Sequence, residues 1–520
     1  MQTRTDQPIG GPSARSRPTT PASTAPPPAT LRRVGRDTLI YGGAFVLSKF
    51  ISFLMLPIYT RYLTPADYGT LQLITTTLDA VEIFAGAGLV SGIFYLFHKA
   101  DTEGDRRAVL SSAFVVMLTS YCAAGVVAYG AAPFMAGQVL GGAGDAGLLR
   151  IAAVSLALSC ATVVPLAYLQ VSGAAIGFVA ASVGRLLLQV VLNVYFLVVL
   201  GLGVKAVLLS TLLTNLVIGG GLVAYFIRRV GLHVSWPNAR ALLRFGVPLV
   251  AVQVGTFIAT FGDRYFLKAA ADTSVVGVYA LAYQFGFLLA ALGSVPFEKV
   301  WEPARFAIAK RPDRDDVFAR SFVYYNVLLL TVAVGIVLFV HDVLRIMAAP
   351  AYWGAASLVP VILIAIVLQS WTPVHNLGIM MRERTELITW ANWAAAAVAL
   401  GGYAWLIPRY LGLGAAVATV LAYAVRAIMV YVLSQRLWPV AYRWGPILRL
   451  VGLATAVTVA RSAVPATTPL LSSIVGSVVL LVAYGVGVLY AGVLSREERD
   501  ALYRAVRSPH TSFVNLLTRS

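Results

Sequence analysis

Residues 38–60 read TLIYGGAFVLSKFISFLMLPIYT, an apolar run in which Lys49 is the one charged side chain. A helix of roughly 20 apolar residues crosses the hydrocarbon core of a bilayer. The run lacks a small-residue cleavage site and leads into further apolar segments, so we interpret it as a first membrane span and not as a cleaved signal. The stretch therefore predicts an integral membrane protein.

The rest of the chain has the same character. Of its 520 residues, 59% are hydrophobic and 12% are charged, and the mean hydropathy is +0.79. Soluble domains carry about 25% charged residues, so a water-soluble protein is excluded. The composition predicts an all-α, polytopic membrane helix bundle of about 14 transmembrane helices. We place them near residues 38–60, 70–97, 108–132, 148–170, 174–199, 204–227, 241–267, 274–298, 318–340, 355–380, 385–407, 412–435, 446–464 and 470–494.

The loops between these spans alternate in charge. With the N-terminus in the cytoplasm, the inside loops and both tails hold 29 of the 40 Lys and Arg residues, and the outside loops and helix ends hold eight. Basic residues stay on the cytoplasmic side of a membrane, and this bias accounts for the net charge of +18 without nucleic acid. The pattern predicts cytoplasmic N- and C-termini and an even number of spans.

We divide the chain into five parts. Residues 1–36 are rich in Pro, Ser, Thr and Arg, and they predict a disordered basic cytoplasmic tail. Spans one to six form an N-lobe at 37–230, and spans seven to twelve form a C-lobe at 240–437. Spans 13 and 14 occupy 444–494, and a cytoplasmic tail occupies 495–520.

A weak repeat relates the two lobes. Arg61-Tyr62 is followed by Tyr68-Gly69, and Arg264-Tyr265 is followed by Gly277 and a further tyrosine. Each copy has an Arg-Tyr pair at an outer helix end, a short loop and a glycine at the start of the next helix. Six spans separate the copies, so both have the same orientation, as in transporters built from parallel repeats.

Four cationic side chains are candidates for binding a substrate: Lys49, Arg185, Arg264 and Arg426. A charge in the middle of a membrane costs on the order of 3 kcal/mol, so such residues usually face a cavity or a partner. Arginine matches the oxygens of phosphate. The alternative is that each side chain reaches an interface or pairs with a neighbouring carboxylate. We favour pairing for Arg264 and a cavity for Lys49 and Arg185.

Three carboxylates are candidates for ion coupling or for the wall of a cavity: Asp79, Glu82 and Asp263. Asp79 and Glu82 lie three residues apart and share one face of a helix. Two carboxylates at this spacing do not both ionise easily without a cation. The alternative is that they form a buried ion cluster with Lys49 that fixes the packing of spans one and two.

No enzyme chemistry is predicted. We find no nucleophile–base set, no cluster of metal ligands and no phosphate-binding GxxxxGK[ST] loop. The loops are short, and no segment outside the membrane is large enough to form an active site alone. We therefore expect neither a metal nor a cofactor.

Residues 41–69, which include LPIYTRYLTPADYG at 56–69, resemble the opening of oligosaccharide flippases of the Wzx type. These are polysaccharide biosynthesis proteins of the multidrug/oligosaccharidyl-lipid/polysaccharide (MOP) superfamily. DRYFL at 263–267 with GVY at 277–279 resembles the start of that family's second half. NLG at 376–378 with Arg384-Thr385 is similar to its turn between spans ten and eleven. The similarity covers roughly residues 35–440. Many Wzx proteins have twelve spans, whereas lipid II flippases of the same superfamily have fourteen.

The resemblance implies two pseudo-symmetric six-helix lobes in a V around a central cavity, with two further C-terminal helices. It implies alternating access that moves undecaprenyl-diphosphate-linked oligosaccharide from the inner to the outer leaflet of a bacterial cell membrane. Lys49 and the span-two carboxylates would line the N-lobe cavity, and Arg264 would lie in the C-lobe. The implied partners are the lipid-linked oligosaccharide, membrane lipids, and the glycosyltransferases and polymerase of a polysaccharide pathway.

Other functions remain open. A drug or cation exporter of the same superfamily would have an acidic cavity, whereas a diphosphate substrate requires a cationic one. A flippase for a lipid II-type peptidoglycan precursor shares the fold. A membrane glycosyltransferase or polymerase would need a large external loop, which the sequence lacks, and a scaffold for cell-wall assembly would need no cavity.

Overall fold

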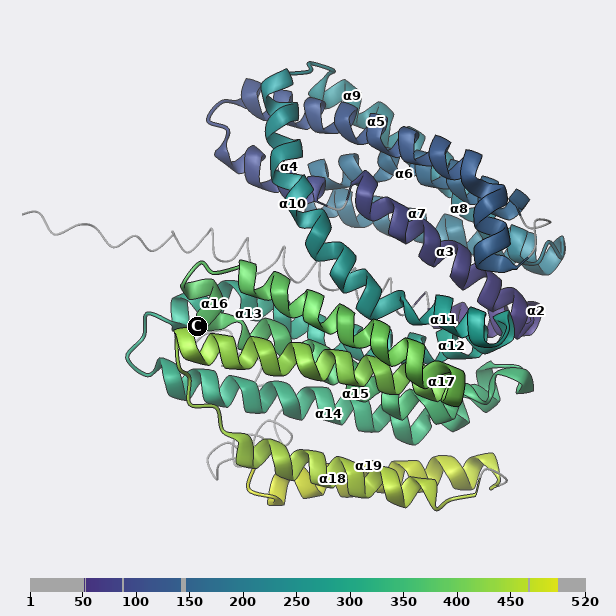
Figure 1. Ribbon diagram of the computed structural model, residues 1–520, viewed down its shortest axis with the longest axis vertical. Helices are drawn as coiled ribbons and strands as arrows, with labels where there is room; N and C mark the ends of the chain where they lie inside the picture. Colours follow the sequence, from purple (N-terminus) through teal and green to yellow (C-terminus); the bar gives the residue numbers. More distant parts are fainter. Residues whose placement is uncertain (1–50, 52, 87, 142–145, 466–467, 494–520) are drawn as a thin grey trace, which may run out of the picture.

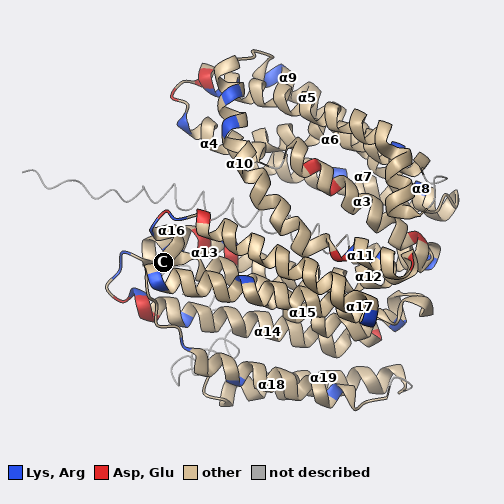
Figure 2. Ribbon diagram, in the orientation of Figure 1, with Lys and Arg blue, Asp and Glu red and all other residues tan. Residues whose placement is uncertain are grey.

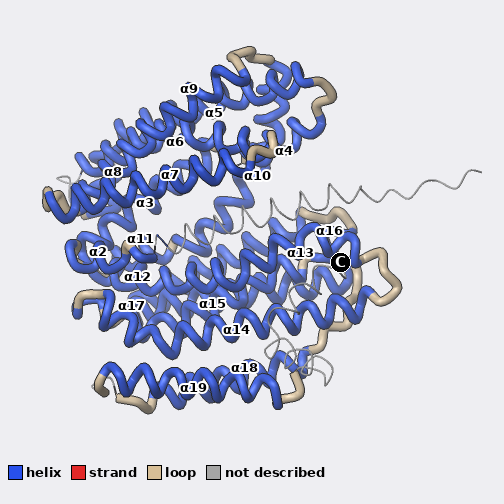
Figure 3. Tube along the Cα trace, turned by 180° about the vertical axis from the view of Figure 1, so that it is seen from behind, coloured by secondary structure: helices blue, strands red, loops and turns tan. Residues whose placement is uncertain are grey.

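The computed structural model describes residues 51, 53–86, 88–141, 146–465 and 468–493, and every regular element within these ranges is helical (Figure 3). Lys49, most of the first predicted span and both predicted tails lie outside the described residues. Within them, eleven helices are long and apolar enough to cross a membrane, and the chain is a multi-pass membrane protein.

The helices coincide with the predicted spans, with ends that differ by up to ten residues, as for the span predicted to end at 298, whose helix continues to Ile308. The exception is the first span, of which only the end is described. Several spans contain a π-helical turn, at Ala136–Leu140, Tyr195–Val199, Asn215–Gly219 and Ala290–Ser294. The α-helices are α2 (Leu56–Tyr62), α3 (Pro65–Ala85), α4 (Leu89–Lys99), α5 (Glu103–Met135), α6 (Ala146–Val171), α7 (Ala175–Val194), α8 (Val204–Thr214), α9 (Gly220–Val230), α10 (Trp236–Phe261), α11 (Asp263–Ala270), α12 (Thr273–Leu289), α13 (Val295–Ile308), α14 (Arg314–Met347), α15 (Ala355–His375), α16 (Leu377–Met381), α17 (Glu386–Leu437), α18 (Trp444–Ser462) and α19 (Leu470–Tyr490).

Helix α17 comprises two predicted spans, 385–407 and 412–435. The chain reverses at Leu411, whose φ of 47° and ψ of −125° are not helical. The Tyr403 hydroxyl lies 3.2 Å from Thr419 Oγ1, sixteen residues further on, which a straight helix does not allow. Gly414 makes the tight reversal possible, because a Cβ atom there would lie 2.3 Å from the carbonyl oxygen of Leu406.

The helices form two bundles, with α3 to α9 in one and α11 to α17 in the other (Figure 1). From here on, the N-lobe means residues 56–230 and the C-lobe means residues 263–437, so α10 is counted in neither. Helix α10 connects them, because it begins against α4 and α5 and ends against α17. The lobes meet near α2, α11 and the start of α12, and their ribbons diverge toward α4 and α16 (Figure 1).

The end at which the lobes meet, formed by residues 60–69, 263–277 and 347–354, is called the closed end. Here α3 packs across α12, and the Tyr352 hydroxyl donates to the carbonyl oxygen of Leu63 at 3.0 Å. Thr60 Oγ1 donates to the carbonyl oxygen of Met347 at 3.1 Å. Next to this end, a hydrogen bond of 3.0 Å joins Thr77 of α3 to the Tyr265 hydroxyl of α11.

The two glycines of the sequence repeat lie against each other at this crossing. Gly69 and Gly277 each occupy the fifth position of their helix, after the N-caps Thr64 and Asp272. A Cβ atom on Gly69 would lie 1.8 Å from the carbonyl oxygen of Thr273, and one on Gly277 would lie 2.0 Å from that of Pro65. The repeated glycines therefore allow the backbones of equivalent helices from the two lobes to touch.

Replacing Gly277 by alanine is expected to force α3 and α12 apart. The atom that the new methyl group meets is backbone and cannot swing away, so the cost is about 1–3 kcal/mol. We expect a lower unfolding temperature for the purified variant. Gly335→Ala is the matched control, since no heavy atom lies within 4 Å of its Cβ position in α14. Equal stability of the two variants would contradict the close crossing.

Helices α18 and α19 pack on α14, on the side of the C-lobe that faces away from the N-lobe (Figures 1 and 3). A buried polar cluster fixes them there. Ser473 Oγ donates to Asp342 Oδ1 at 2.6 Å, and the Arg461 guanidinium donates to Ser473 Oγ at 2.9 Å. Arg461 is 9% exposed and Asp342 is 1% exposed. An apolar cavity of about 380 Å³ lies between α14, α15 and α18.

Candidate functional site

Three charged candidates of the N-lobe lie on α3 and α7. Asp79 is exposed in the middle of α3, and Glu82 is half-buried one turn further along. Arg185 is the one basic residue of α7. Glu82 is the carboxylate that interacts electrostatically with its guanidinium. Figure 2 shows the red segments of α3 beside the blue segment of α7. We call Asp79, Glu82 and Arg185 the charged group.

Glu82 is held in place by a neighbouring helix. The Tyr121 hydroxyl of α5 donates to Glu82 Oε1 at 2.9 Å, and the Tyr121 side chain is 2% exposed. Gly86 allows this contact, because a Cβ atom there would lie 2.5 Å from the tyrosine ring. The hydrogen bond orients one carboxylate, while Asp79 remains accessible.

The helix spacing explains why the two carboxylates lie together. Asp79 and Glu82 are three residues apart and share one face of α3, as the sequence predicts. Lys49, the third member of the predicted ion cluster, lies outside the described residues. Among the described residues, Arg185 interacts electrostatically with Glu82, and Arg264 interacts with Asp79. The sequence placed Arg185 in a cavity but gave no sign of this association.

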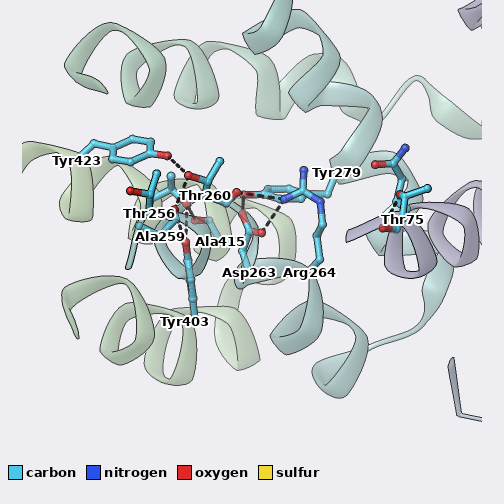
Figure 4. Close-up of polar contacts among 12 residues, drawn as sticks. Thr75, Thr256, Ala259, Thr260, Asp263, Arg264, Tyr279, Tyr403, Ala415 and Tyr423 are labelled. Carbon is cyan, nitrogen blue, oxygen red and sulfur yellow. Dashed lines mark hydrogen bonds and ion pairs between the residues drawn. The ribbon is translucent and has the colours of Figure 1, made fainter. Parts of the chain in front are cut away.

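Arg264 and Asp263 lie in the interior of the C-lobe, and their exposed fractions are 1% and 0% (Figure 4). Arg264 Nη1 lies 3.0 Å from Asp263 Oδ1 and also donates to the carbonyl oxygen of Thr260 at 3.2 Å. The Tyr279 hydroxyl donates to Asp263 Oδ2 at 2.5 Å. The structure thus has the paired arrangement that we favour for Arg264, and neither side chain is open to a substrate in this conformation.

The pair is enclosed by aromatic side chains. The Arg264 guanidinium lies 4.8 Å from the ring centroids of both Phe261 and Tyr283, a distance typical of cation–π contacts. Since burying unpaired charges costs several kcal/mol, this packing together with the ion pair makes the interior site possible. The DRYFL motif at 263–267 therefore contains a structural ion pair within the C-lobe.

Arg426 is the fourth cationic candidate, and it is partly exposed on α17. It lies one turn from Tyr423, whose hydroxyl forms a 2.8 Å hydrogen bond with Thr260 of α10. Within the described residues, Arg426 Nε has no hydrogen-bond partner. The structure does not bring Arg426 into the charged group, and it lies in the other lobe.

No cluster of His, Cys, Asp and Glu side chains that could hold a metal ion occurs in the part of the chain that the structure describes. Sequence reasoning missed Tyr121 and a set of glutamine and threonine side chains near the charged group. Gln72 and Thr75 precede Asp79 at helical spacing on α3, and this uncharged polar stripe was the available signal.

Comparison with solved structures identifies the fold. The chain has a TM-score of 0.68 with the lipid II flippase MurJ in an inward closed conformation, at 12% identity, over 86% of this chain and 97% of that one. It has a TM-score of 0.62 with an inward-facing multidrug resistance transporter of the MATE family, at 19% identity, over 75% of this chain and 94% of that one. The chain has a TM-score of 0.56 with a MOP superfamily transporter from Pyrococcus furiosus, at 18% identity, over 77% of this chain and 95% of that one. The fold is that of MOP superfamily transporters.

The family follows from the sequence. The model of the polysaccharide biosynthesis protein family matches residues 58–347, which is more than half of the chain, and the protein belongs to that family. No curated protein sequence matches the chain. The description of the family concerns polysaccharide biosynthesis, and the solved structures with this fold are those of flippases and transporters.

Proposed function

We propose that the protein moves an undecaprenyl-diphosphate-linked oligosaccharide from the inner to the outer leaflet of a bacterial plasma membrane for the export of surface polysaccharide. Arg185 is the observation that carries the proposal. A guanidinium in the middle of a membrane-spanning helix costs free energy unless it meets a partner. Phosphate oxygens match its geometry. Family membership supports a substrate of the polysaccharide pathway.

We assign the closed end to the outer face of the membrane and both termini to the cytoplasm. The loops at the opposite end hold most of the described basic residues, as Figure 2 shows around α4, α9 and α16. Basic loops remain in the cytoplasm. In this assignment, the described conformation is closed to the outside.

The cycle that we propose is alternating access. The diphosphate and the sugar enter between the lobes from the cytoplasm and meet Arg185, while the polyprenyl tail stays in the lipid. The α3–α12 crossing then separates, and the head group leaves on the outer side. Asp79 and Glu82 would carry a cation or a proton in exchange for the diphosphate, because the single guanidinium of Arg185 cannot neutralise both carboxylates. Lys49 and Arg426 remain predicted contributors from either side of the substrate.

A cation exporter is the second candidate, and one observation favours it. Among the described residues, the charged group contains two carboxylates and one guanidinium, an acidic balance. The transporter from Pyrococcus furiosus is described by a reversed polarity of its binding pocket, so polarity varies within this fold. A flippase for a lipid II-type precursor also fits the likeness to MurJ.

Reconstitution into liposomes distinguishes these functions. Fluorescent undecaprenyl diphosphate carrying a short oligosaccharide is placed in both leaflets, and the fraction protected from a membrane-impermeant quencher is followed in time. We expect exchange between leaflets only in liposomes that contain the protein. Transport of a lipophilic cation without exchange of the lipid would favour the exporter, and exchange restricted to lipid II would favour the peptidoglycan precursor.

A further inference from the structure

A second polar region lies beside the charged group, toward the closed end. It is a cavity of about 240 Å³ between α2, α3, α7 and α8 of the N-lobe and α12 of the C-lobe. Thr75 and Gln72 on α3 border it one and two turns before Asp79, and Gln189 on α7 borders it one turn after Arg185. Since residues four apart share a helix face, the cavity and the charged group occupy the same faces of both helices.

The chemistry of this cavity is neutral. Its described lining contains three glutamine amides and several hydroxyl groups, and none of these lining residues is charged. Gln189 Nε2 donates to Thr211 Oγ1 at 3.2 Å, and Gln284 Nε2 donates to the Tyr68 hydroxyl at 3.2 Å. An amide has two N–H donors and a carbonyl acceptor, so each of these groups has capacity beyond the bond described.

Aromatic rings form another part of the wall. Tyr59 and Tyr68 lie with their ring centroids 6.4 Å apart, and Phe53 also borders the cavity. The Tyr59 hydroxyl accepts from Asn193 Nδ2 at 2.8 Å, which fixes the ring. The cavity therefore offers donors and acceptors beside apolar ring faces, and a sugar ring presents the complementary combination of hydroxyl groups and C–H faces.

The cavity differs in kind from the charged group. An ion would find no opposite charge among the described lining residues, and an apolar drug would leave the remaining donors and acceptors of the half-buried amides without partners. A cavity of about 240 Å³ has room for a small polar group such as one monosaccharide ring.

We propose that this glutamine-lined cavity is a subsite for one uncharged sugar, the residue attached directly to the diphosphate. The inference rests on the proposed function, since it places the diphosphate at Arg185, one helical turn away. Gln284 belongs to α12 of the C-lobe, whereas Gln72 and Gln189 belong to the N-lobe. The sugar would bind both lobes at once, and the subsite would be divided when the closed end opens.

The test measures binding by purified protein in nanodiscs. The probes are undecaprenyl diphosphate alone, the same lipid carrying one neutral hexose, and the lipid carrying one hexuronic acid. We expect the wild type to bind the hexose lipid at least about tenfold more tightly than the bare or the hexuronic acid lipid. Gln189→Leu and Gln284→Leu should each reduce this preference about three- to tenfold, because each removes one neutral hydrogen-bonding group. Affinity for the bare lipid should not change.

Gln138→Leu is the matched control, because Gln138 is exposed in the π-helical turn Ala136–Leu140 and does not border the cavity. Equal wild-type affinity for the bare and the hexose lipids would overturn the subsite, whether or not the variants fold. A preference that survives both glutamine substitutions would also overturn it. A short alkyl glucoside, which lacks phosphate, separates the two proposals. Binding of the glucoside that is lost in the variants, with no binding of any diphosphate lipid, would support the subsite and contradict the proposed function.

Discussion

Replacing Arg185 by glutamate is expected to abolish export of surface polysaccharide while the protein remains in the membrane. The substitution removes the proposed phosphate ligand and places a third carboxylate beside Asp79 and Glu82. A charge-assisted hydrogen bond contributes about 1.5–3 kcal/mol, so the lipid exchange rate should fall more than about tenfold. The exchange assay in liposomes measures the rate directly, and blotting of membrane fractions measures the amount of protein.

Lys205→Glu is the matched control for this prediction. It makes the same reversal of charge in the N-lobe, but Lys205 is exposed at the start of α8. It should leave the exchange rate unchanged. Arg185→Lys keeps the charge without the planar fork of donors, and we expect an intermediate rate. Normal exchange by the glutamate variant would remove Arg185 from the substrate path.

Asp263→Ala is expected to cause the largest loss of stability. It would leave the Arg264 guanidinium fully buried in the C-lobe without its counter-ion, and it would also remove the acceptor of the Tyr279 hydroxyl. Breaking one side of a buried ion pair costs about 3–5 kcal/mol. The free energy of unfolding in mixed micelles should fall by that amount, and the yield of folded protein should fall with it.

Asp272→Ala provides the comparison on a neighbouring helix. Asp272 is an exposed N-cap whose carboxylate accepts from the backbone of Ser274 and Val275 at 2.9 and 3.1 Å. Removing such a cap costs about 1 kcal/mol. If Asp263→Ala were as mild as Asp272→Ala, the interior pair would not be an essential part of the C-lobe.

Much of the fold could be predicted because the bilayer imposes simple rules on sequence. Apolar length placed the spans, and the Arg-Tyr and glycine repeat related the two halves. The structure gives that repeat a physical meaning, since Gly69 and Gly277 touch across the lobes. The reversal at Leu411 was also predicted as a boundary, although its left-handed backbone was not.

The candidate site was harder to predict from the sequence than the fold. Charges in the middle of spans pointed to Asp79, Glu82 and Arg185, because a membrane makes every such charge conspicuous. The same rule also selected Arg264, which is satisfied by Asp263 within the C-lobe. Neutral side chains such as Gln189 and Gln284 carry no charge, so they stand out less in the sequence of a membrane helix. They converge only through the packing of helices from both lobes, which periodicity within one helix does not contain.

Locking the closed end tests the alternating-access account most directly. In a protein lacking Cys122 and Cys160, cysteines replace Thr77 and Tyr265, which contact each other across the lobes, and a reducible bifunctional reagent joins them. We predict that lipid exchange stops on cross-linking and returns when the same sample is reduced. Undiminished exchange by fully cross-linked protein would contradict the separation of α3 from the C-lobe, and with it the proposed transport cycle.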